Sequence, residues 1–284
     1  MNKEVISKKE NHLDVLIADC ICRFLFDNTR LFHLFKKEFP PVSRVKVQPT
    51  ILIRIVNEDK DDPLRYRILK DKGKKESIYC FPSNTASLTR NIKFGMSVLL
   101  QYLLLEKNVL LMHASSSVHN GRGFLFPGPS GTGKSTMISN FRKKDVLSDD
   151  IAIIKKIKNE YYLYNSPFDY GKYENKNQRM IKLTNIFFLE KSGYNKMHPF
   201  GPLETLDRMF HNTILVYFEN LVNSSLRKDK NPLLKKITAN NRTEKNYWDT
   251  IFKQIYQQLF AIILSVPSQR VLFTKKVNID ELFV

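Results

Sequence analysis

The sequence has no long hydrophobic run, and this absence argues against a membrane-spanning protein. Its richest apolar stretches, residues 97–105 and 259–266, are far shorter than the roughly 18 residues that a transmembrane helix needs. Residues 1–14 contain no apolar core of the kind found in signal peptides. We therefore expect a cytoplasmic protein that is not inserted in a membrane.

Cysteine is also scarce. Cys20, Cys22 and Cys80 are odd in number and form no disulfide framework, and neither they nor the six histidines have the spacing of metal ligands. Cys20 and Cys22 would lie on one face of a strand, where buried thiols act as small apolar side chains. No chemistry is assigned to the cysteines.

Acidic residues are few in comparison with basic ones. The chain has 46 Lys and Arg against 28 Asp and Glu, a formal net charge of +18. Such an excess often indicates a nucleic-acid or acidic-membrane partner. Here the basic residues are spread along the chain, and their local concentration at residues 227–245 matches no nucleic-acid motif. A solvated basic surface is the favoured interpretation, an acidic protein or peptide partner is second, and nucleic acid is third.

The remaining pattern predicts a mixed α/β protein. With 284 residues and 42% hydrophobic content, the chain can bury a substantial core. Strand-like runs within residues 12–90 predict a β-rich N-terminal subdomain, residues 1–91. A helical segment at 92–107 leads into a buried strand at 109–118, which opens the second domain, 92–284. Strand-like and helical segments then alternate, with helices gathered toward the C-terminus.

The stretch "FPGPSGTGKST", residues 126–136, carries the strongest functional signal. It satisfies the pattern G-x-x-x-x-G-K-[ST]. Glycines allow successive backbone N–H groups to point at phosphate oxygens, the lysine reaches the outer phosphates, and the serine hydroxyl ligates magnesium. A strand at 121–126 and a helix at 134–144 are predicted on either side. The predicted nucleotide-binding residues are Gly128, Pro129, Ser130, Gly131, Thr132, Gly133, Lys134, Ser135 and Thr136. A chance glycine-rich turn is the weaker alternative.

Two adjacent carboxylates follow the loop. Asp149 and Asp150 lie soon after Ser135, with room for a helix and a short strand between them. Such a crossover would return the end of that strand to the edge of the sheet that carries the loop. Beside a triphosphate, one acid can help to hold magnesium and the other can accept a proton from an attacking hydroxyl. An ordinary Asp-rich turn is the alternative, and spacing alone does not separate the two.

His113 ends the apolar run "VLLMH" and is followed by small residues. By position alone, a hydrogen-bonded core histidine is a more ordinary interpretation than a catalytic one.

Taken in order, "HASSSVHNGRGFLFPGPSGTGKST…VLSDD" resembles the HPr kinase/phosphorylase family. The likeness is greatest to the shorter relatives without the regulatory domain, such as kinases of lasso-peptide precursors. It continues more weakly through residues 165–168, 186–210 and 266–273, and so covers roughly residues 95–278.

This resemblance implies a nucleotide-binding fold of the phosphoenolpyruvate-carboxykinase type, with ATP and Mg²⁺ as cofactors. It implies transfer of the γ-phosphoryl group to a serine hydroxyl of a small protein or peptide. His113 would support one acid of the pair. Asp149 or Asp150 would act as the base while the other assists magnesium, and Lys134 with Ser135 would hold the phosphates and the metal; we take Ser135 and Asp150 as the expected metal ligands.

The resemblance leaves the assisting arginine unassigned, because spacing cannot separate Arg122, Arg179 and Arg208. The arginine-glycine signature of the full HPr enzymes is absent, which disfavours HPr itself as the acceptor. Two other functions stay open: a small-molecule kinase on the same fold, and a regulatory protein that binds a nucleotide without catalysis. A transport ATPase is disfavoured because no "SGGQ"-like signature occurs.

Overall fold

The computed structural model describes residues 11–39, 41, 49–58, 68–70, 76–82, 88–169, 179–214, 216 and 242–283. The chain divides into two compact units, Met1–Met96 and Ser97–Val284. The division falls within helix α2 (Leu88–Leu105). Most of the basic concentration at residues 227–245 lies outside the described residues.

The first unit contains a five-stranded sheet, ordered β1-β2-β3-β5-β4, helix α1 (Thr29–Glu38) and the first part of α2. Ala18 and Asp19, both with positive φ, form the two-residue turn of the first hairpin, a geometry that matches strand twist. The strands are β1 (Asn11–Ile17), β2 (Cys20–Phe26), β3 (Ile51–Glu58), β4 (Ile68–Lys70) and β5 (Glu76–Pro82). Cys20 and Cys22 are buried, as the strand alternation predicted.

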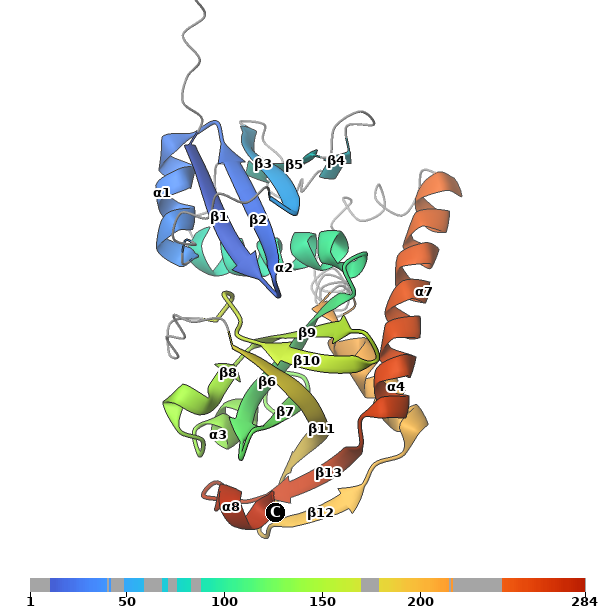
Figure 1. The fold of residues 1–284 in the computed structure, drawn as a ribbon. Helices are drawn as coiled ribbons and strands as arrows, with labels where there is room; N and C mark the ends of the chain where they lie inside the picture. The colour runs from blue at the N-terminus through green and yellow to red at the C-terminus, as the bar shows by residue number, and fades with distance from the viewer. Residues whose placement is uncertain are drawn as a thin grey trace, which may run out of the picture. The chain divides into compact units, whose positions relative to one another are not determined.

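The second unit is built on an eight-stranded sheet with the order β10-β9-β6-β7-β11-β13-β12, and β8 pairs with β6 (Figure 1). Because β10 also pairs with β11, strands β10, β9, β6, β7 and β11 close on themselves. The strands are β6 (Val109–His119), β7 (Arg122–Pro127), β8 (Val146–Ser148), β9 (Ile151–Ile157), β10 (Glu160–Tyr164), β11 (Met180–Lys191), β12 (Lys196–Pro199) and β13 (Ser268–Phe273).

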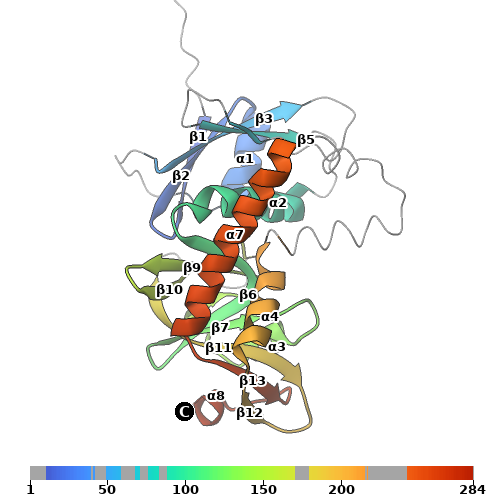
Figure 2. The ribbon, with the colours of Figure 1, turned by 90° about the vertical axis from the view of Figure 1, so that its right-hand side faces the viewer.

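Helices complete the second unit, which confirms the coarse prediction of a mixed α/β fold. Among the described residues they are the part of α2 that follows Met96, α3 (Lys134–Ile138), α4 (Pro202–Asn212), α7 (Arg242–Ser265) and α8 (Ile279–Leu282). Helix α4 packs against α7, and Figure 2 shows the two helices side by side. Within the described ranges, no helix is long and apolar enough to cross a membrane.

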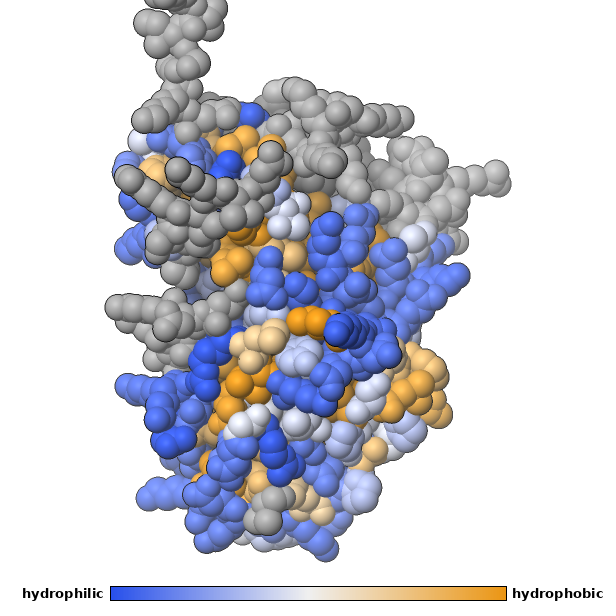
Figure 3. Space-filling model, in the orientation of Figure 1, coloured by the Kyte–Doolittle hydropathy of each residue, from blue (hydrophilic) through white to orange (hydrophobic). Residues whose placement is uncertain are grey.

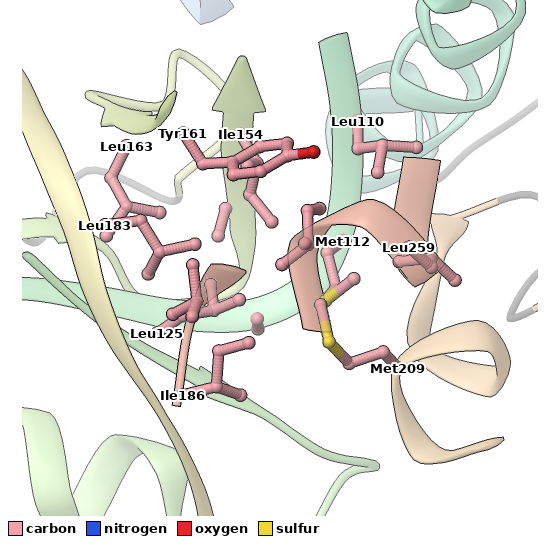
Figure 4. Packing of buried hydrophobic residues seen from close by; sticks show 14 of the residues in the cluster. Leu110, Met112, Leu125, Ile154, Tyr161, Leu163, Leu183, Ile186, Met209 and Leu259 are labelled. Atoms are coloured by element: carbon pink, nitrogen blue, oxygen red, sulfur yellow. The ribbon is translucent and has the colours of Figure 1, made fainter. Parts of the chain in front are cut away.

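Two cores cover the two faces of the central strands. Leu110, Met112, Tyr161, Ile186 and Leu259 belong to the first core, in which strands β6, β10 and β11 meet α7 (Figure 4).

The second core is aromatic and includes Phe124, Phe126, Phe187, Phe273 and Phe283. Burial of each phenylalanine contributes about 1.5–3 kcal/mol. Both faces are buried at residues 124–126 of β7 and 186–189 of β11, and these two segments are continuously apolar.

The helix expected at 134–144 is shorter than predicted. Helix α3 ends at Ile138, and a 3₁₀ helix at Lys143–Asp145 precedes β8. Ser139 Oγ and Asn140 Nδ2 both donate to the carbonyl oxygen of Thr136, at 2.8 Å each. Such side chains compete with the helical backbone pattern, which explains the early end.

Candidate functional site

Three parallel strands end beside one another in the second unit. Strand β11 runs parallel to both β7 and β13, and the three end at Pro127, Lys191 and Phe273. Parallel strands place their carboxyl ends at a common edge, where α/β proteins bind ligands. The glycine loop, residues 128–136, begins at this edge directly after β7.

The backbone of the glycine loop requires its glycines. Gly131 and Gly133 have φ values of 91° and 102°, a region that residues with a side chain rarely adopt. A Cβ atom on Gly133 would lie 2.5 Å from Cζ of Phe273. The loop therefore lies directly against the end of β13.

Lys134 is buried within the loop, with 7% of its surface exposed. Its Nζ donates hydrogen bonds to the carbonyl oxygens of Gly128 at 2.5 Å and Pro129 at 3.0 Å. Burial lowers the pKa of Lys134 to about 8, and the nearby charge of Asp150 works in the opposite direction. The arrangement holds an ammonium group among backbone oxygens that phosphate oxygens can replace.

Asp149 and Asp150 interrupt what would otherwise be one strand, β8 and β9, beside β6. Ser115 Oγ donates to the Asp149 carbonyl oxygen at 2.8 Å, and the Ala114 N–H donates to that of Asp150 at 3.0 Å. Ala114 pairs on its other side with Pro127, the last residue of β7. Two strand spacings, or roughly 10 Å, therefore separate the acid pair from the start of the glycine loop.

His113 lies next to Asp150. The His113 Nε2 to Asp150 Oδ1 distance is 3.3 Å, and the histidine is buried. Burial raises the pKa of Asp150, but the hydrogen bond and charge of His113 and the charge of Lys134 outweigh it, so this pKa lies below its ordinary value. The structure thus brings together His113, Asp150 and Lys134, which are distant in the sequence.

A third carboxylate lies behind the acid pair, and the sequence analysis missed it. Asp169 Oδ1 accepts a hydrogen bond from Ser148 Oγ at 2.9 Å, and its Oδ2 accepts one from the Asp149 N–H at 3.2 Å. Ser148 Oγ also accepts from the Asp150 N–H at 3.3 Å. Burial, followed by the charge of Asp149, raises the pKa of Asp169 well above its ordinary value.

Nothing in the spacing of the sequence pointed to Asp169. It directly follows the weakly matching segment 165–168, but twenty residues separate it from Asp149. The β9–β10 hairpin brings the chain back, and the Ser166 N–H donates to the Leu147 carbonyl oxygen at 3.1 Å. The contact between Asp169 and the Asp149 N–H becomes visible only through this pairing of distant segments.

In the part of the chain that the structure describes, no hydrogen bond or ion pair joins the three candidate arginines to the acid pair or the glycine loop. Arg122 begins β7, about 17 Å of strand from Pro127 at its other end, and donates to Asn185 Oδ1 at 3.2 Å. Arg179 donates to the Lys144 carbonyl oxygen.

Arg208 is engaged on α4. It pairs with Glu204 at 3.2 Å and lies 4.9 Å from the centre of the Phe200 ring.

Lysines, instead, lie beside the glycine loop. A cavity of about 410 Å³ is lined by Thr136, Lys191, Ser192, Phe273 and Lys275. Lys191 ends β11 and Lys275 follows β13 by two residues, so both extend from the edge at which the parallel strands end. The sequence analysis assigned neither of them.

The glycine loop fits the phosphates of a nucleotide, since its glycines leave backbone space and its lysine can exchange partners. Among the described residues, no group of three or more His, Cys, Asp or Glu side chains is placed to hold a metal ion. Magnesium commonly uses only one or two carboxylates together with phosphate oxygens. The exposed Ser135 and the half-buried Asp150 would be its protein ligands.

Fold and site together define a mixed α/β protein with a glycine loop and a histidine-supported acid pair at one sheet edge. A family model described as "SynChlorMet cassette protein ScmC" matches residues 83–243. This is more than half of the chain, which therefore belongs to the ScmC family. The matched span includes the glycine loop, the acid pair and Asp169, and it ends before β13. No match is found among curated proteins.

Proposed function

We propose that this chain is an ATP- and magnesium-dependent kinase that phosphorylates a hydroxyl group, expected to be a serine, on a small protein or peptide. One observation carries the proposal. Asp150, hydrogen-bonded to the buried His113, lies one intervening strand away from a glycine loop whose lysine is close enough to shift its pKa. Phosphoryl transfer needs such positioned charges more than it needs covalent catalysis.

The glycine loop, residues 128–136, would hold the phosphates. Lys134 would transfer its hydrogen bonds from the carbonyl oxygens of Gly128 and Pro129 to phosphate oxygens. Ser135 and Asp150 would hold magnesium. With Asp150 as a metal ligand, the role of base would fall to Asp149.

When bound, ATP with magnesium supplies the phosphoryl group. Asp149 would take the proton of the acceptor hydroxyl, the hydroxyl oxygen would bond to the γ-phosphorus, and ADP would leave with the electrons of the broken phosphoanhydride bond. His113 keeps Asp150 charged and oriented throughout. Asp169 and Ser148 hold the backbone of both acids in place.

An acidic acceptor, the second interpretation of the net charge of +18, would associate faster with this chain because opposite charges attract. Hydrophilic residues cover much of the face seen in Figure 3, with apolar residues between them. The description of the family as a cassette protein makes products of neighbouring genes the first acceptors to test.

The test is transfer of label from γ-labelled ATP, with magnesium, to small proteins and peptides encoded beside the gene. Label should appear on a serine and be lost in the Asp149→Asn/Asp150→Asn variant. Asp280→Asn is the matched control, because Asp280 also pairs with a histidine but lies elsewhere. Undiminished labelling in the double variant would contradict the proposal, and label on a metabolite would identify a small-molecule kinase instead.

A further inference from the structure

We infer that the cavity beside the glycine loop binds the nucleoside and α-phosphate of the nucleotide, with Lys191 and Lys275 as its anion-binding side chains. This inference rests on the proposed function in taking residues 128–136 as the site for the outer phosphates and the acid pair as the side on which the γ-phosphate lies. It assigns the opposite end of the ligand to a surface that adjoins the glycine loop and the ends of β11 and β13.

The cavity adjoins the glycine loop directly. Thr136, which lines it, immediately follows the expected magnesium ligand Ser135. A Cβ atom on Gly133 would lie 3.5 Å from Cε of Lys191 and within contact of the Phe273 ring. A ligand held by the loop would therefore be in reach of the cavity without any movement of the strands.

The direction of the nucleotide follows from the order of the strands. Strand β7, which carries the glycine loop, lies between β6 and β11. The acid pair lies on the β6 side, and Lys191, Ser192 and Phe273 lie on the β11 and β13 side. If the γ-phosphate lies near the acids, the nucleoside has to extend across the loop toward the cavity.

The chemistry of the lining suits a nucleoside phosphate. Both lysines are exposed, and among the described residues neither forms an ion pair with a carboxylate. An ammonium group only donates hydrogen bonds, so it recognises phosphate and sugar oxygens. Ser192 Oγ already accepts a hydrogen bond from the Tyr194 N–H at 3.4 Å, which leaves its own proton to donate.

The size of the cavity is also appropriate. Its volume of about 410 Å³ lies within the range of roughly 300–1,000 Å³ that is usual for small-molecule sites. The ring of Phe273 supplies an apolar surface at its base, next to the loop. Apolar surface with a few directed polar groups is the usual composition of such sites.

The test compares two ligands by calorimetry in the presence of magnesium: a non-hydrolysable ATP analogue and inorganic pyrophosphate, which represents the two outer phosphates alone. In the Lys191→Ala/Lys275→Ala variant, we expect the preference for the nucleotide over pyrophosphate to fall roughly tenfold, because only the nucleotide has an α-phosphate and a nucleoside that reach the cavity. Lys196→Ala/Lys276→Ala removes the same charge from exposed lysines that do not line the cavity, and should leave the preference unchanged.

An unchanged preference in Lys191→Ala/Lys275→Ala, with nucleotide binding lost in Lys134→Ala, would overturn this inference and leave the proposed kinase standing. Reduced preference without any phosphoryl transfer to an acceptor would support the cavity and count against the kinase. Absence of nucleotide binding to the unaltered protein would overturn both.

Discussion

Strand β6 carries the histidines of two histidine–aspartate pairs that are alike in geometry and different in surroundings. His113 and Asp150 are 3.3 Å apart at the site, and His119 and Asp280 are 3.4 Å apart near the end of the same strand. The Asp150 side chain is 38% exposed and that of Asp280 is 82% exposed. Only the first pair lies beside the glycine loop. The comparison teaches that a histidine–aspartate pair does not by itself mark a site and that its surroundings matter, since such pairs also occur away from the loop.

The largest difference should appear when each aspartate is neutralised. Asp150→Asn removes a proposed metal ligand, and we expect phosphoryl transfer to fall about a hundredfold or more. Asp280→Asn removes a solvent-screened partner, and the rate should stay within about twofold. Initial rates of label transfer at saturating ATP provide the measurement. Equal losses in the two variants would break the comparison.

Replacement of the histidines should give a smaller difference. His113→Gln removes a group that orients Asp150 and lowers its pKa. We expect roughly a tenfold loss of rate, as is common when a group that supports a metal ligand is removed. His119→Gln should have little effect on rate. A loss confined to kcat would indicate positioning of the reacting groups, and a loss confined to KM for ATP would contradict that role.

Asp169 extends the comparison between the two pairs, because it lies behind Asp149 and Asp150 and supports their backbone. Asp169→Asn replaces one acceptor oxygen by a donor that faces Ser148 Oγ or the Asp149 N–H, and we expect roughly a tenfold loss of transfer with nucleotide affinity retained. Asp145→Asn, at the other end of β8, removes the ion pair with Arg142 and serves as control. The measurements are the rate of phosphoryl transfer and the calorimetric affinity for the nucleotide in both variants.

The smallest effect concerns pH. The pKa of Asp150 is lowered in the folded state, so its contribution to stability is present above the ordinary aspartate pKa of about 3.9 and is lost as pH falls through the folded pKa. The pKa of Asp169 is raised, so its contribution has the opposite sign and declines as pH rises above about 3.9.

Denaturant unfolding across this range should therefore show that Asp169→Asn flattens the loss of stability with rising pH. Asp150→Asn should flatten the loss with falling pH. Asp280→Asn should leave the profile almost unchanged, because a solvent-exposed pair contributes less than about 1 kcal/mol. If the Asp280→Asn profile changed as much as that of Asp150→Asn, the distinction between the two pairs would be lost.

Features with a short-range cause could be predicted from the sequence. The positive φ values of Gly131 and Gly133 are a local requirement of the loop, and it can be recognised from adjacent residues in the sequence. The alternation in β2 placed Cys20 and Cys22 in a core. The helix after the loop was predicted too long, because Ser139 and Asn140 bond to the backbone in competition with the helix.

By itself, the sequence determined the mixed α/β class, the glycine loop and the presence of an acid pair, since each depends on neighbouring residues. Only the tertiary structure decided that His113 meets Asp150, that Asp169 supports the pair, and that Arg122 begins its strand far from the loop. It also placed Lys191 and Lys275 around one cavity. The physical reason is that strand pairing joins residues that are distant along the chain, and packing of the whole sheet selects those pairings.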